Sequence, residues 1–270
     1  MKIAVCIKQV PGTTEIKIDP ETNTLVRQGI ENIINPFDTY AVEEGVSIKE
    51  RLDADESYKE GPEVIALTMG PPQAEEMLKE VVAVGVDRVV LLSDRAFAGA
   101  DTWATSSTLA MAIDKLEGVG LVIFGKQTLD GDTGQVGPEL AQRMNIPFIG
   151  YVSEIMEISA SKIKVKRLAE DRYEIFEVRL PAAISVIKDI NTPRVPSLRG
   201  KMKAKSTEVP VWTASDLGAS GDEVGLSGSY TQVVKIFIPK MVHDVRMIEG
   251  AAEEQVEELF KALKELNVVS

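Results

Sequence analysis

Apolar runs of strand length alternate with helical patterns in the first half of the chain, and this alternation constrains the fold more than any other feature. The strand-like runs occupy residues 3–7, 64–68, 89–92 and 121–124. The helical patterns between them cover about 38–52, 71–84 and 101–116. Strands separated by helices build βαβ units, whose sheet is parallel and carries helices on both faces. The pattern therefore predicts an α/β fold.

The next part of the chain predicts an antiparallel addition to this sheet. Strand-like segments follow at 148–152, 162–168, 173–180 and 182–187. The middle two alternate around residues 169–172, which indicates a β-hairpin, and the segments extend the parallel sheet at one edge. Residues 189–199 contain Pro193 and Pro196, which exclude regular secondary structure there.

Residues 200–250 have weak periodicity, many Ser and Gly residues, and a basic start at Lys201, Lys203 and Lys205. Such a segment does not easily build its own core, so it is either disordered or an arm laid over a partner. An amphipathic helix follows at 251–266, with Val256, Leu259, Phe260, Leu263 and Leu266 on one face. We expect this helix to dock on a partner subunit, with docking on its own domain as the alternative. The predicted organisation is an α/β domain at 1–199 and an arm with a helix at 200–270.

Composition excludes several classes of function. A formal net charge of −12 argues against nucleic-acid binding, which requires a basic surface. The single cysteine, Cys6, excludes an internal disulfide and is expected in the core. One histidine, His243, leaves no material for a His-dependent triad or a His-rich zinc site. The chain starts directly on a strand and has no apolar run long enough to span a membrane, which favours a cytoplasmic protein.

Residues 121–145 join a strand end, a polar loop rich in Gly, Asp and Thr, and the start of an amphipathic helix. Asp132 and Gln135 form an N-cap signature. The apolar stripe of this helix consists of Val136, Leu140, Ala141 and Met144. Backbone N–H groups and the helix dipole at such a junction attract anions, so the stretch predicts a phosphate site, with an ordinary polar loop as the alternative. The acidic Asp130 and Asp132 would then serve as caps or hydroxyl acceptors.

Small or polar residues follow other strands of the predicted sheet, and ligands bind at this edge of such sheets. Asp38 is predicted to cap the helix that follows, while the Asn35 amide is placed to read the edge of an adenine. Gly70 lets a ligand approach the backbone closely or only serves the turn.

The loop at 93–107 joins another strand end to a helix start. Asp101 is predicted as the N-cap of this helix, and Gly99 frees the backbone just before it. Thr102 and Thr105 lie one turn apart, so their hydroxyls can face a flavin edge or a nicotinamide. A purely structural role for these two residues is the alternative.

Four long motifs follow one another along the chain: VCIKQVPG (5–12), NPFDTYAVEEG (35–45), GKQTLDGDTGQVGPELA (125–141) and VRLPAAISVIKDINTPRVPSLRGKMKAK (178–205). In sequence and order they resemble the β (small) subunit of electron-transfer flavoproteins along essentially the full length. The resemblance implies an adenine-nucleotide α-hydrolase-like α/β fold. It also implies an obligate heterodimer with the α subunit, which the C-terminal arm and helix embrace.

The resemblance also implies a set of functional residues. The loop at about 188–199 would dock an acyl-CoA dehydrogenase, with Leu198 as the apolar anchor. No catalytic side chain and no metal ligand are expected. Together with the strand-end loops, the predicted cofactor-binding residues are Cys6 (through its backbone), Asn35, Pro36, Phe37, Asp38, Met69, Gly70, Asp94, Gly99, Asp101, Thr102, Thr105, Gly125, Lys126, Gln127, Thr128, Asp130, Gly131, Asp132, Thr133, Gly134, Gln135 and Val136.

The identity of the nucleotide separates two functions within this family. Members that hold AMP pass single electrons from dehydrogenases to a membrane quinone reductase. Members that hold a second FAD bifurcate: hydride from NADH yields one electron for ferredoxin or flavodoxin and one for an acyl-CoA dehydrogenase, through the α-subunit FAD. The segment SDRAFAGADTWATS (93–106) resembles the bifurcating type, because its small residues leave room for an isoalloxazine ring. We therefore expect FAD, with AMP as the alternative and a regulatory nucleotide-binding module as a third hypothesis.

Overall fold

The computed structural model describes residues 1–12, 32–56, 58, 61–234, 245 and 247–269. The chain divides into two compact units, Met1–Val234 and Lys235–Ser270. The first unit carries the sheet, and the second contains the helix α7 (Ala252–Glu265). His243 lies outside the described residues. Within the described residues, none of the helices combines the length and the apolar character that crossing a bilayer demands.

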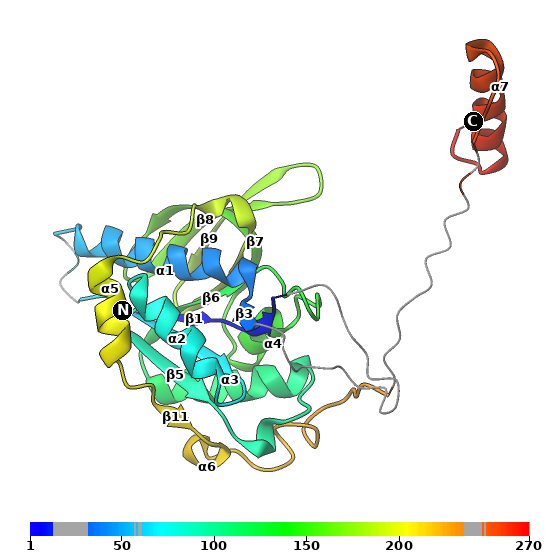
Figure 1. Ribbon diagram of the computed structural model, residues 1–270. Coiled ribbons are helices and arrows are strands. Elements are labelled where there is room, and N and C mark those ends of the chain that lie inside the picture. Colours follow the sequence, from blue (N-terminus) through cyan, green and yellow to red (C-terminus); the bar gives the residue numbers. More distant parts are fainter. Residues whose placement is uncertain (13–31, 57, 59–60, 235–244, 246, 270) are drawn as a thin grey trace. The chain divides into compact units, whose positions relative to one another are not determined.

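A nine-stranded sheet forms the centre of the first unit (Figure 1). Its strands, in spatial order, are β11 (Val211–Trp212), β5 (Arg88–Leu92), β4 (Glu63–Met69), β1 (Lys2–Cys6), β6 (Val119–Gly125), β10 (Ala182–Val186), β7 (Phe148–Ile158), β8 (Lys162–Leu168) and β9 (Tyr173–Arg179). Neighbouring strands from β11 to β7 are parallel. The pairs β7–β8 and β8–β9 are antiparallel, which confirms the expected hairpin at the sheet edge.

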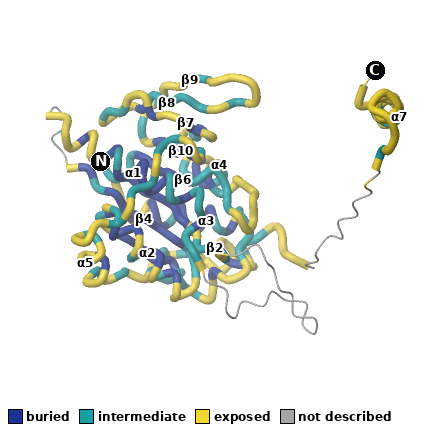
Figure 2. The backbone as a smooth tube through the Cα atoms, turned by 45° about the horizontal axis from the view of Figure 1, so that its top comes forward, coloured by how far each residue is buried: buried dark blue, intermediate teal, exposed yellow. Residues whose placement is uncertain are grey.

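Helices cover both faces of the sheet, as the alternating pattern predicts. They are α1 (Pro36–Asp53), α2 (Ala74–Ala83), α3 (Thr102–Leu116), α4 (Val136–Arg143), α5 (Leu198–Ser206) and the short α6 (Ala214–Leu217). Successive side chains of a strand point to opposite faces. Val5 accordingly packs with residues of α1 and α2, and Cys6 packs with residues of α3 and α4. Figure 2 shows the resulting buried core along the central strands. The predicted α/β class is confirmed.

Short elements complete the unit. The strands β2 (Gln9–Pro11) and β3 (Asn32–Ile34) form a small antiparallel pair. Two 3₁₀ turns, η1 (Arg95–Phe97) and η2 (Lys188–Ile190), follow β5 and β10. The expected helix at 71–84 begins only at Ala74, because Pro71 and Pro72 occupy the turn before it, where their carbonyls accept the Ala74 and Glu75 N–H groups.

The segment 198–234 differs from the expected coreless arm. It belongs to the first compact unit, which ends at Val234 rather than near residue 199. The helix α5 buries Ala204 beside α2, β11 pairs with β5, and Val224 is buried in the core under α3. The sequence gives little sign of this packing, since α5 reads LRGKMKAKS and buries a single small residue. One buried alanine produces no helical periodicity.

The contact between α5 and α2 depends on a glycine. A Cβ at Gly200 would collide with the carbonyl oxygen of Ala83, so only glycine fits there. Alanine normally stabilises a helix interior by ~1 kcal/mol relative to glycine. We expect the collision to reverse this sign, so that Gly200→Ala lowers the free energy of unfolding by about 1–3 kcal/mol in urea titrations.

Gly221→Ala is the matched control, because among the described residues no heavy atom lies within 4 Å of a Cβ at Gly221. Its free energy of unfolding should stay within about 0.5 kcal/mol of the wild-type value. A Gly200→Ala variant as stable as the wild type would contradict the close packing of α5.

Candidate functional site

A pocket of about 660 Å³ opens at the carboxyl ends of the central strands, where the sequence predicts a ligand. Its lining comes from the strand ends at Cys6, Met69 and Phe124 and from the starts of α3 and α4. The loop between β6 and α4 and residues 231–233 complete it. Its volume lies within the roughly 300–1,000 Å³ common for small-molecule sites.

The start of α4 fits the predicted anion site, although it is not capped as predicted. Asp132 lies in an exposed turn with φ 53°, and its N–H donates to the Thr128 carbonyl. The helix begins at Val136 instead, and within the described residues the side chain of its N-cap, Gln135, makes no capping hydrogen bond. The first amides of α4, at Val136 and Gly137, therefore lie at the pocket free to meet an anionic group.

Asn35 positions the glycine-rich loop rather than reading an adenine. The side chain is fully buried, its Nδ2 donates to the Gln127 carbonyl at 2.8 Å, and its Oδ1 accepts the Leu129 N–H at 3.3 Å. The amide is thus occupied by the loop backbone, and the predicted adenine contact is wrong for this side chain. The loop gains a fixed shape in return.

The acidic residue Asp130 is neutralised by a basic partner. Its carboxylate lies 2.7 Å from the Lys8 Nζ. Burial raises the pKa of Asp130, but the hydrogen bond and charge of Lys8 outweigh it and leave the pKa below its ordinary value. The pair removes the repulsion that Asp130 alone would exert on a phosphate.

Asp38 joins the ends of two strands and is not the predicted N-cap. The N-cap of α1 is Asn35, and Asp38 lies in the first turn, nearly fully buried. Its Oδ2 accepts the Lys8 N–H at 2.7 Å, and its carboxyl also accepts the Gly125 N–H. A Cβ at Gly125 would collide with this carboxyl, which explains the glycine at the end of β6.

Burial dominates the electrostatics beneath the pocket. It raises the pKa of Asp38 to about 7, even though the Lys8 and Gly125 amides and the Asn35 side chain favour the ionised form. Burial, followed by the charge of Asp38, also raises the pKa of the Cys6 thiol far above its ordinary value. Cys6 is therefore a neutral core residue that reaches the pocket floor, as expected.

The loop after β5 and the start of α3 form the wall next to α4, where the Thr102 hydroxyl donates to Gln135 Oε1 at 3.3 Å. Asp101 caps α3 as predicted, with Oδ1 accepting the Ala104 N–H at 3.0 Å. Gly99, Thr102 and Thr105 line the pocket. Asp94 has a different task, since its carboxylate caps η1 and accepts the Ala214 N–H at 3.0 Å.

The structure brings most of the predicted site residues together around this pocket. The residues that line it are Cys6, Asp38, Met69, Gly99, Asp101, Thr102, Thr105, Gly125, Lys126, Gln127, Thr128, Gly131, Thr133, Gly134, Gln135 and Val136. In the described part of the chain, the predicted residues outside this lining are Asn35, Pro36, Phe37, Gly70, Asp94, Asp130 and Asp132. Asn35 and Asp130 still shape the loop through the contacts given above.

Sequence reasoning missed several lining residues. Lys8 follows β1 and Ser185 lies next to the last residue of β10, so the strand-end rule was a usable signal for these two residues. Phe148 begins β7, and this rule gives no signal for it. Thr231, Gln232 and Val233 carry no comparable signal. They follow a segment without periodicity, and only long-range contacts place them at the pocket.

Comparison with known proteins identifies the family. A family model for the electron transfer flavoprotein domain matches residues 22–217. The chain is 43% identical, over 100% of both chains, to the electron transfer flavoprotein subunit beta of Thermoanaerobacterium thermosaccharolyticum. The chain belongs to the electron transfer flavoprotein β-subunit family.

Two further members of this electron transfer flavoprotein family carry more specific names. The chain is 46% identical, over 100% of both chains, to the caffeyl-CoA reductase-Etf complex subunit CarD of Acetobacterium woodii. It is 38% identical to the protein FixA of Azorhizobium caulinodans, over 97% of this chain and 94% of the relative. The resemblance inferred from the motifs is therefore confirmed.

The loop at 188–199 of this β subunit is held against α1. The Arg194 guanidinium bonds the Glu43 carboxylate at 2.9 Å and the Glu50 carboxylate at 2.6 Å, and Asn191 Nδ2 donates to the Tyr40 carbonyl and the Glu44 carboxylate at 3.0 Å each. Leu198, at the start of α5, is 79% exposed. The loop is thus fastened to α1, and an apolar side chain is exposed where the loop meets α5.

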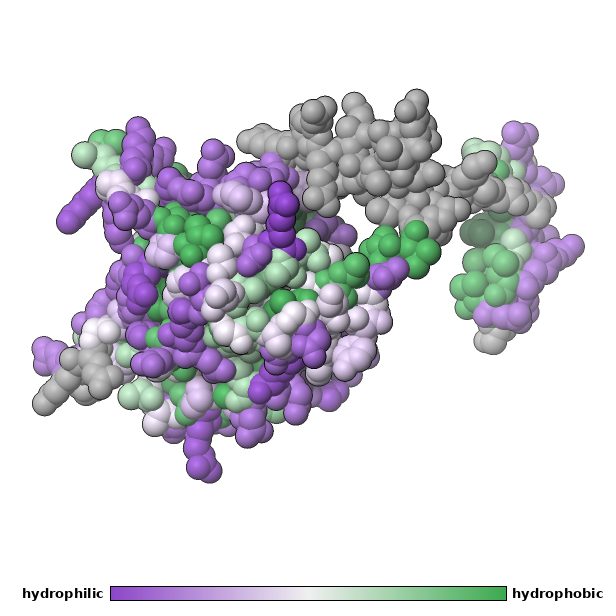
Figure 3. Space-filling model, turned by 90° about the horizontal axis from the view of Figure 1, so that it is seen from below, coloured by the Kyte–Doolittle hydropathy of each residue, from purple (hydrophilic) through white to green (hydrophobic). Residues whose placement is uncertain are grey.

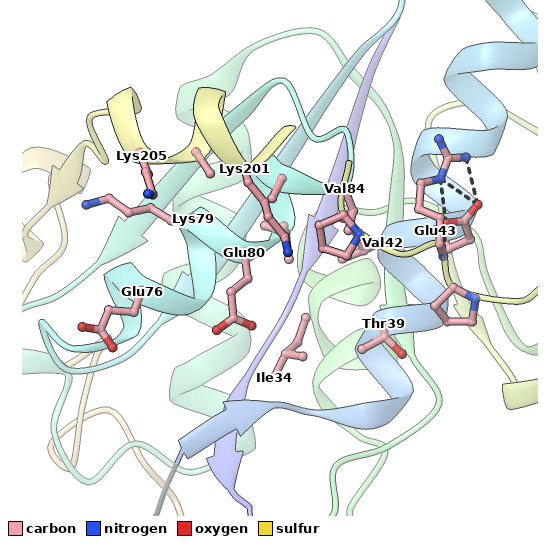
Figure 4. A pocket seen from close by; sticks show the side chains of 16 residues that line it. Ile34, Thr39, Val42, Glu43, Glu76, Lys79, Glu80, Val84, Lys201 and Lys205 are labelled. Atoms are coloured by element: carbon pink, nitrogen blue, oxygen red, sulfur yellow. Dashed lines mark hydrogen bonds and ion pairs between the residues drawn. The ribbon is translucent and has the colours of Figure 1, made fainter. Parts of the chain in front are cut away.

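A second cavity, of about 520 Å³, lies beside this loop (Figure 4). Its lining comes from α1, α2 and α5 and includes Pro193 and Pro196. Figure 4 shows Glu43 bonded at one side of it, while Glu80 and Lys201 reach in from α2 and α5. Lysines and glutamates together line the cavity, so it carries no strong charge of one sign.

In the second unit, α7 matches the predicted amphipathic helix at 251–266. Figure 3 shows a hydrophobic and a hydrophilic side on it. Val256 is 64% exposed, and Leu259 and Phe260 are 49% exposed each. An apolar stripe this exposed is typical of an interaction surface.

The raised pKa of Asp38 makes stability depend on pH in a definite direction. The folded state binds this proton more tightly than the unfolded chain does. The contribution of Asp38 to the free energy of unfolding is therefore complete below about pH 4 and is lost as the pH rises through about 7. The side chain of the Asp38→Asn variant does not ionise, so the variant lacks this loss. The free energy of unfolding of Asp38→Asn minus that of the wild type should therefore be larger at about pH 8 than at about pH 4 by roughly 2 kcal/mol or more.

Urea titrations of both proteins at several pH values measure this difference. Stability curves that stay parallel across the whole range would show that Asp38 titrates normally in the folded protein.

Proposed function

We propose that this chain is the FAD-binding β subunit of an electron-bifurcating electron transfer flavoprotein. When bound, FAD would supply the redox chemistry for taking hydride from NADH and for passing one electron to ferredoxin or flavodoxin and the other, through the α-subunit FAD, to an acyl-CoA dehydrogenase. The observation that carries the proposal is a pocket with two chemically different linings, which meet where the Thr102 hydroxyl bonds Gln135 and Glu139 of α4. The uncapped start of α4 suits phosphates, and the wall at Gly99, Thr102 and Thr105 suits a second ring system.

The phosphate end fits a dinucleotide without a P-loop. The N–H groups of Val136 and Gly137 and the dipole of α4 favour an anion. Gly131 and Gly134 keep side chains out of the loop, and Lys8 compensates the charge of Asp130. This end would accept AMP and FAD alike.

The lining at the start of α3 distinguishes the two nucleotides. Gly99 and Ala100 offer little bulk, the Thr102 hydroxyl bonds the Glu139 carboxylate at 3.1 Å, and Thr105 lines the pocket one turn further. Met69 and Leu109 add apolar surface there. AMP has no second ring system for this wall, whereas the isoalloxazine of FAD does. The relative named as a caffeyl-CoA reductase-Etf complex subunit also supports a coupling to CoA-thioester reduction.

Hydride transfer to a flavin needs no side-chain acid or base, and the chain has one histidine. The role of this subunit is therefore to bind and orient FAD and to tune its reduction potential. Cys6 and Phe124 close the pocket floor against water, and Asp38 fixes the strand ends from beneath.

Two surfaces support the proposed partners. The exposed apolar stripe of α7 fits an α subunit that this helix embraces, and docking there would bury it. Leu198, exposed where the loop anchored by Arg194 meets α5, fits an apolar pocket on an acyl-CoA dehydrogenase. Neither surface requires a nucleic acid or a membrane.

Cofactor extraction tests the proposal directly. The heterodimer with the α subunit is purified, unfolded, and its nucleotides are separated and counted. The proposal predicts two FAD and no AMP per heterodimer. One FAD with one AMP would contradict the proposal and favour a conventional electron carrier that holds AMP. A chain that holds neither nucleotide and needs no α subunit would favour the regulatory module.

A bulky residue at Thr105 tests the ring end of the pocket. Thr105→Phe places a side chain into the proposed flavin space, and overpacking of about 1–3 kcal/mol predicts roughly five- to 150-fold weaker FAD binding at this site. The α-subunit flavin should remain. Gly99 is less suitable for this test, because its φ of +76° strains any side chain.

Asp114→Phe is the matched control for Thr105→Phe. Asp114 is exposed on the same helix and lies outside the pocket lining in the described part of the chain. Both FAD molecules should stay bound in it. Full FAD occupancy in Thr105→Phe would remove this wall from the flavin site.

A further inference from the structure

Residues 231–233 form part of the pocket mouth, although residues 200–230, which separate them from the loop at 188–199, contain only α5, β11, α6 and irregular structure. We propose that Asp101 is a positioning residue that clamps this segment to the pocket, so that nucleotide binding and the fixing of residues 229–233 are linked. The inference rests on the proposed function only in taking the pocket to be a nucleotide site.

The two carboxylate oxygens of Asp101 have separate tasks. Oδ1 accepts the Ala104 N–H and caps α3. Oδ2 accepts the N–H groups of Tyr230 and Thr231 at 2.9 Å each and the Thr231 hydroxyl at 3.0 Å. The Asp101 N–H in turn donates to the Ser229 Oγ at 2.8 Å. The Asp101 side chain therefore bonds both the start of α3 and the segment 229–233 at the pocket mouth.

The chain before the clamp is fitted to the same loop. The Leu226 N–H donates to the Ala98 carbonyl at 3.0 Å. Gly225, with φ 58°, leaves no room for a Cβ beside the Ala96 carbonyl. These contacts align residues 225–226 with the loop at Ala96 and Ala98. The bonds to Asp101 then place the residues that follow, from Ser229 to the pocket mouth.

Aromatic contacts brace the clamp from outside. The Trp103 and Tyr230 rings lie 5.7 Å apart, and the Arg143 guanidinium lies 3.8 Å from the centre of the Trp103 ring. Trp103 is the second residue of α3 and Tyr230 directly precedes Thr231. The ring pair therefore holds the clamped segment in the direction that the Asp101 hydrogen bonds set.

The clamp needs a carboxylate. Burial raises the pKa of Asp101, but the amides of Ala104, Thr231 and Tyr230 outweigh it and leave the pKa below its ordinary value, so the group is ionised at neutral pH. A carboxylate accepts at both oxygens, whereas an asparagine side chain accepts at one and donates at the other. Asn is as good an N-cap as Asp, so Asp101→Asn keeps the cap and replaces the acceptor that faces Tyr230 and Thr231 with a donor.

The linkage follows from ordering. In the wild type, the bonds to Asp101 hold the chain at Tyr230 and Thr231, and residues 231–233 line the pocket. Without the bonds to Asp101, nucleotide binding must also order residues 231–233, and the conformational entropy lost in this way weakens the binding. Linkage is reciprocal, so a bound nucleotide should in turn protect the Tyr230 and Thr231 amides.

The test compares the full wild-type chain with Asp101→Asn, each purified with its α subunit, stripped of nucleotide and titrated with FAD and, separately, with AMP. Hydrogen exchange of the peptide that covers residues 229–233 is followed with and without each nucleotide. We expect faster exchange of this peptide in Asp101→Asn, unchanged exchange at Ala104, and a dissociation constant for the bound nucleotide raised about tenfold. Adding nucleotide should slow exchange of this peptide in the wild type.

Asp216→Asn is the matched control. Asp216 Oδ2 accepts the N–H and hydroxyl of Thr213 in the same manner, but Asp216 is outside the pocket lining in the described part of the chain. Its nucleotide affinity should equal that of the wild type. Thr231→Val, which removes one of the three bonds to Oδ2, should fall between the wild type and Asp101→Asn.

Unchanged protection of residues 229–233 in Asp101→Asn, or unchanged nucleotide affinity despite lost protection, would overturn the clamp. Loss of exchange protection at Ala104 with retained protection at 229–233 would overturn it as well. The result is separable from the proposed function. If the wild type binds AMP and not FAD, bifurcation fails while the AMP titration still decides the role of Asp101.

Discussion

The buried carboxyl of Asp38 joins the carboxyl ends of β1 and β6, and the geometry of the pocket depends on this junction. It accepts the Lys8 N–H and the Gly125 N–H, two backbone donors that the sheet leaves open where its strands end. Gly125 permits the approach because any Cβ there would collide with the carboxyl. The same junction brings Lys8 to Asp130 and Asn35 to the backbone of the loop.

Two aspartates thus fix two walls in different ways. Asp38, in the core, sets the strand ends and the loop that leads to α4. Asp101, at the surface, sets the start of α3 and the segment around Thr231. Between them lies a pocket whose helix N-terminus is left without a side-chain cap in the described residues. Such a division is suited to a subunit that binds and tunes a cofactor while the cofactor supplies the chemistry.

The sequence was informative wherever burial follows a regular period. Strand runs, helices and the strand-end rule predicted the parallel sheet and most of the pocket lining. It was less informative where one residue makes a long-range contact. The sequence predicted an adenine contact for the Asn35 amide and an N-cap role for Asp38. Both predictions missed the actual partners, Gln127 and Lys8, because these are near only in the folded chain. The helix α5 was missed because it buries only Ala204. Residues 231–233 were missed because long-range contacts, among them the bonds from Tyr230 and Thr231 to Asp101, place them at the pocket.

The central claim is that a flavin spans the pocket between these walls. A structure of the heterodimer with its native cofactors tests it most directly. We expect density for FAD in this subunit, with phosphates at the amides of Val136 and Gly137 and the isoalloxazine beside Thr102 and Thr105. Density for AMP alone, with protein or solvent beside Thr105, would contradict the account.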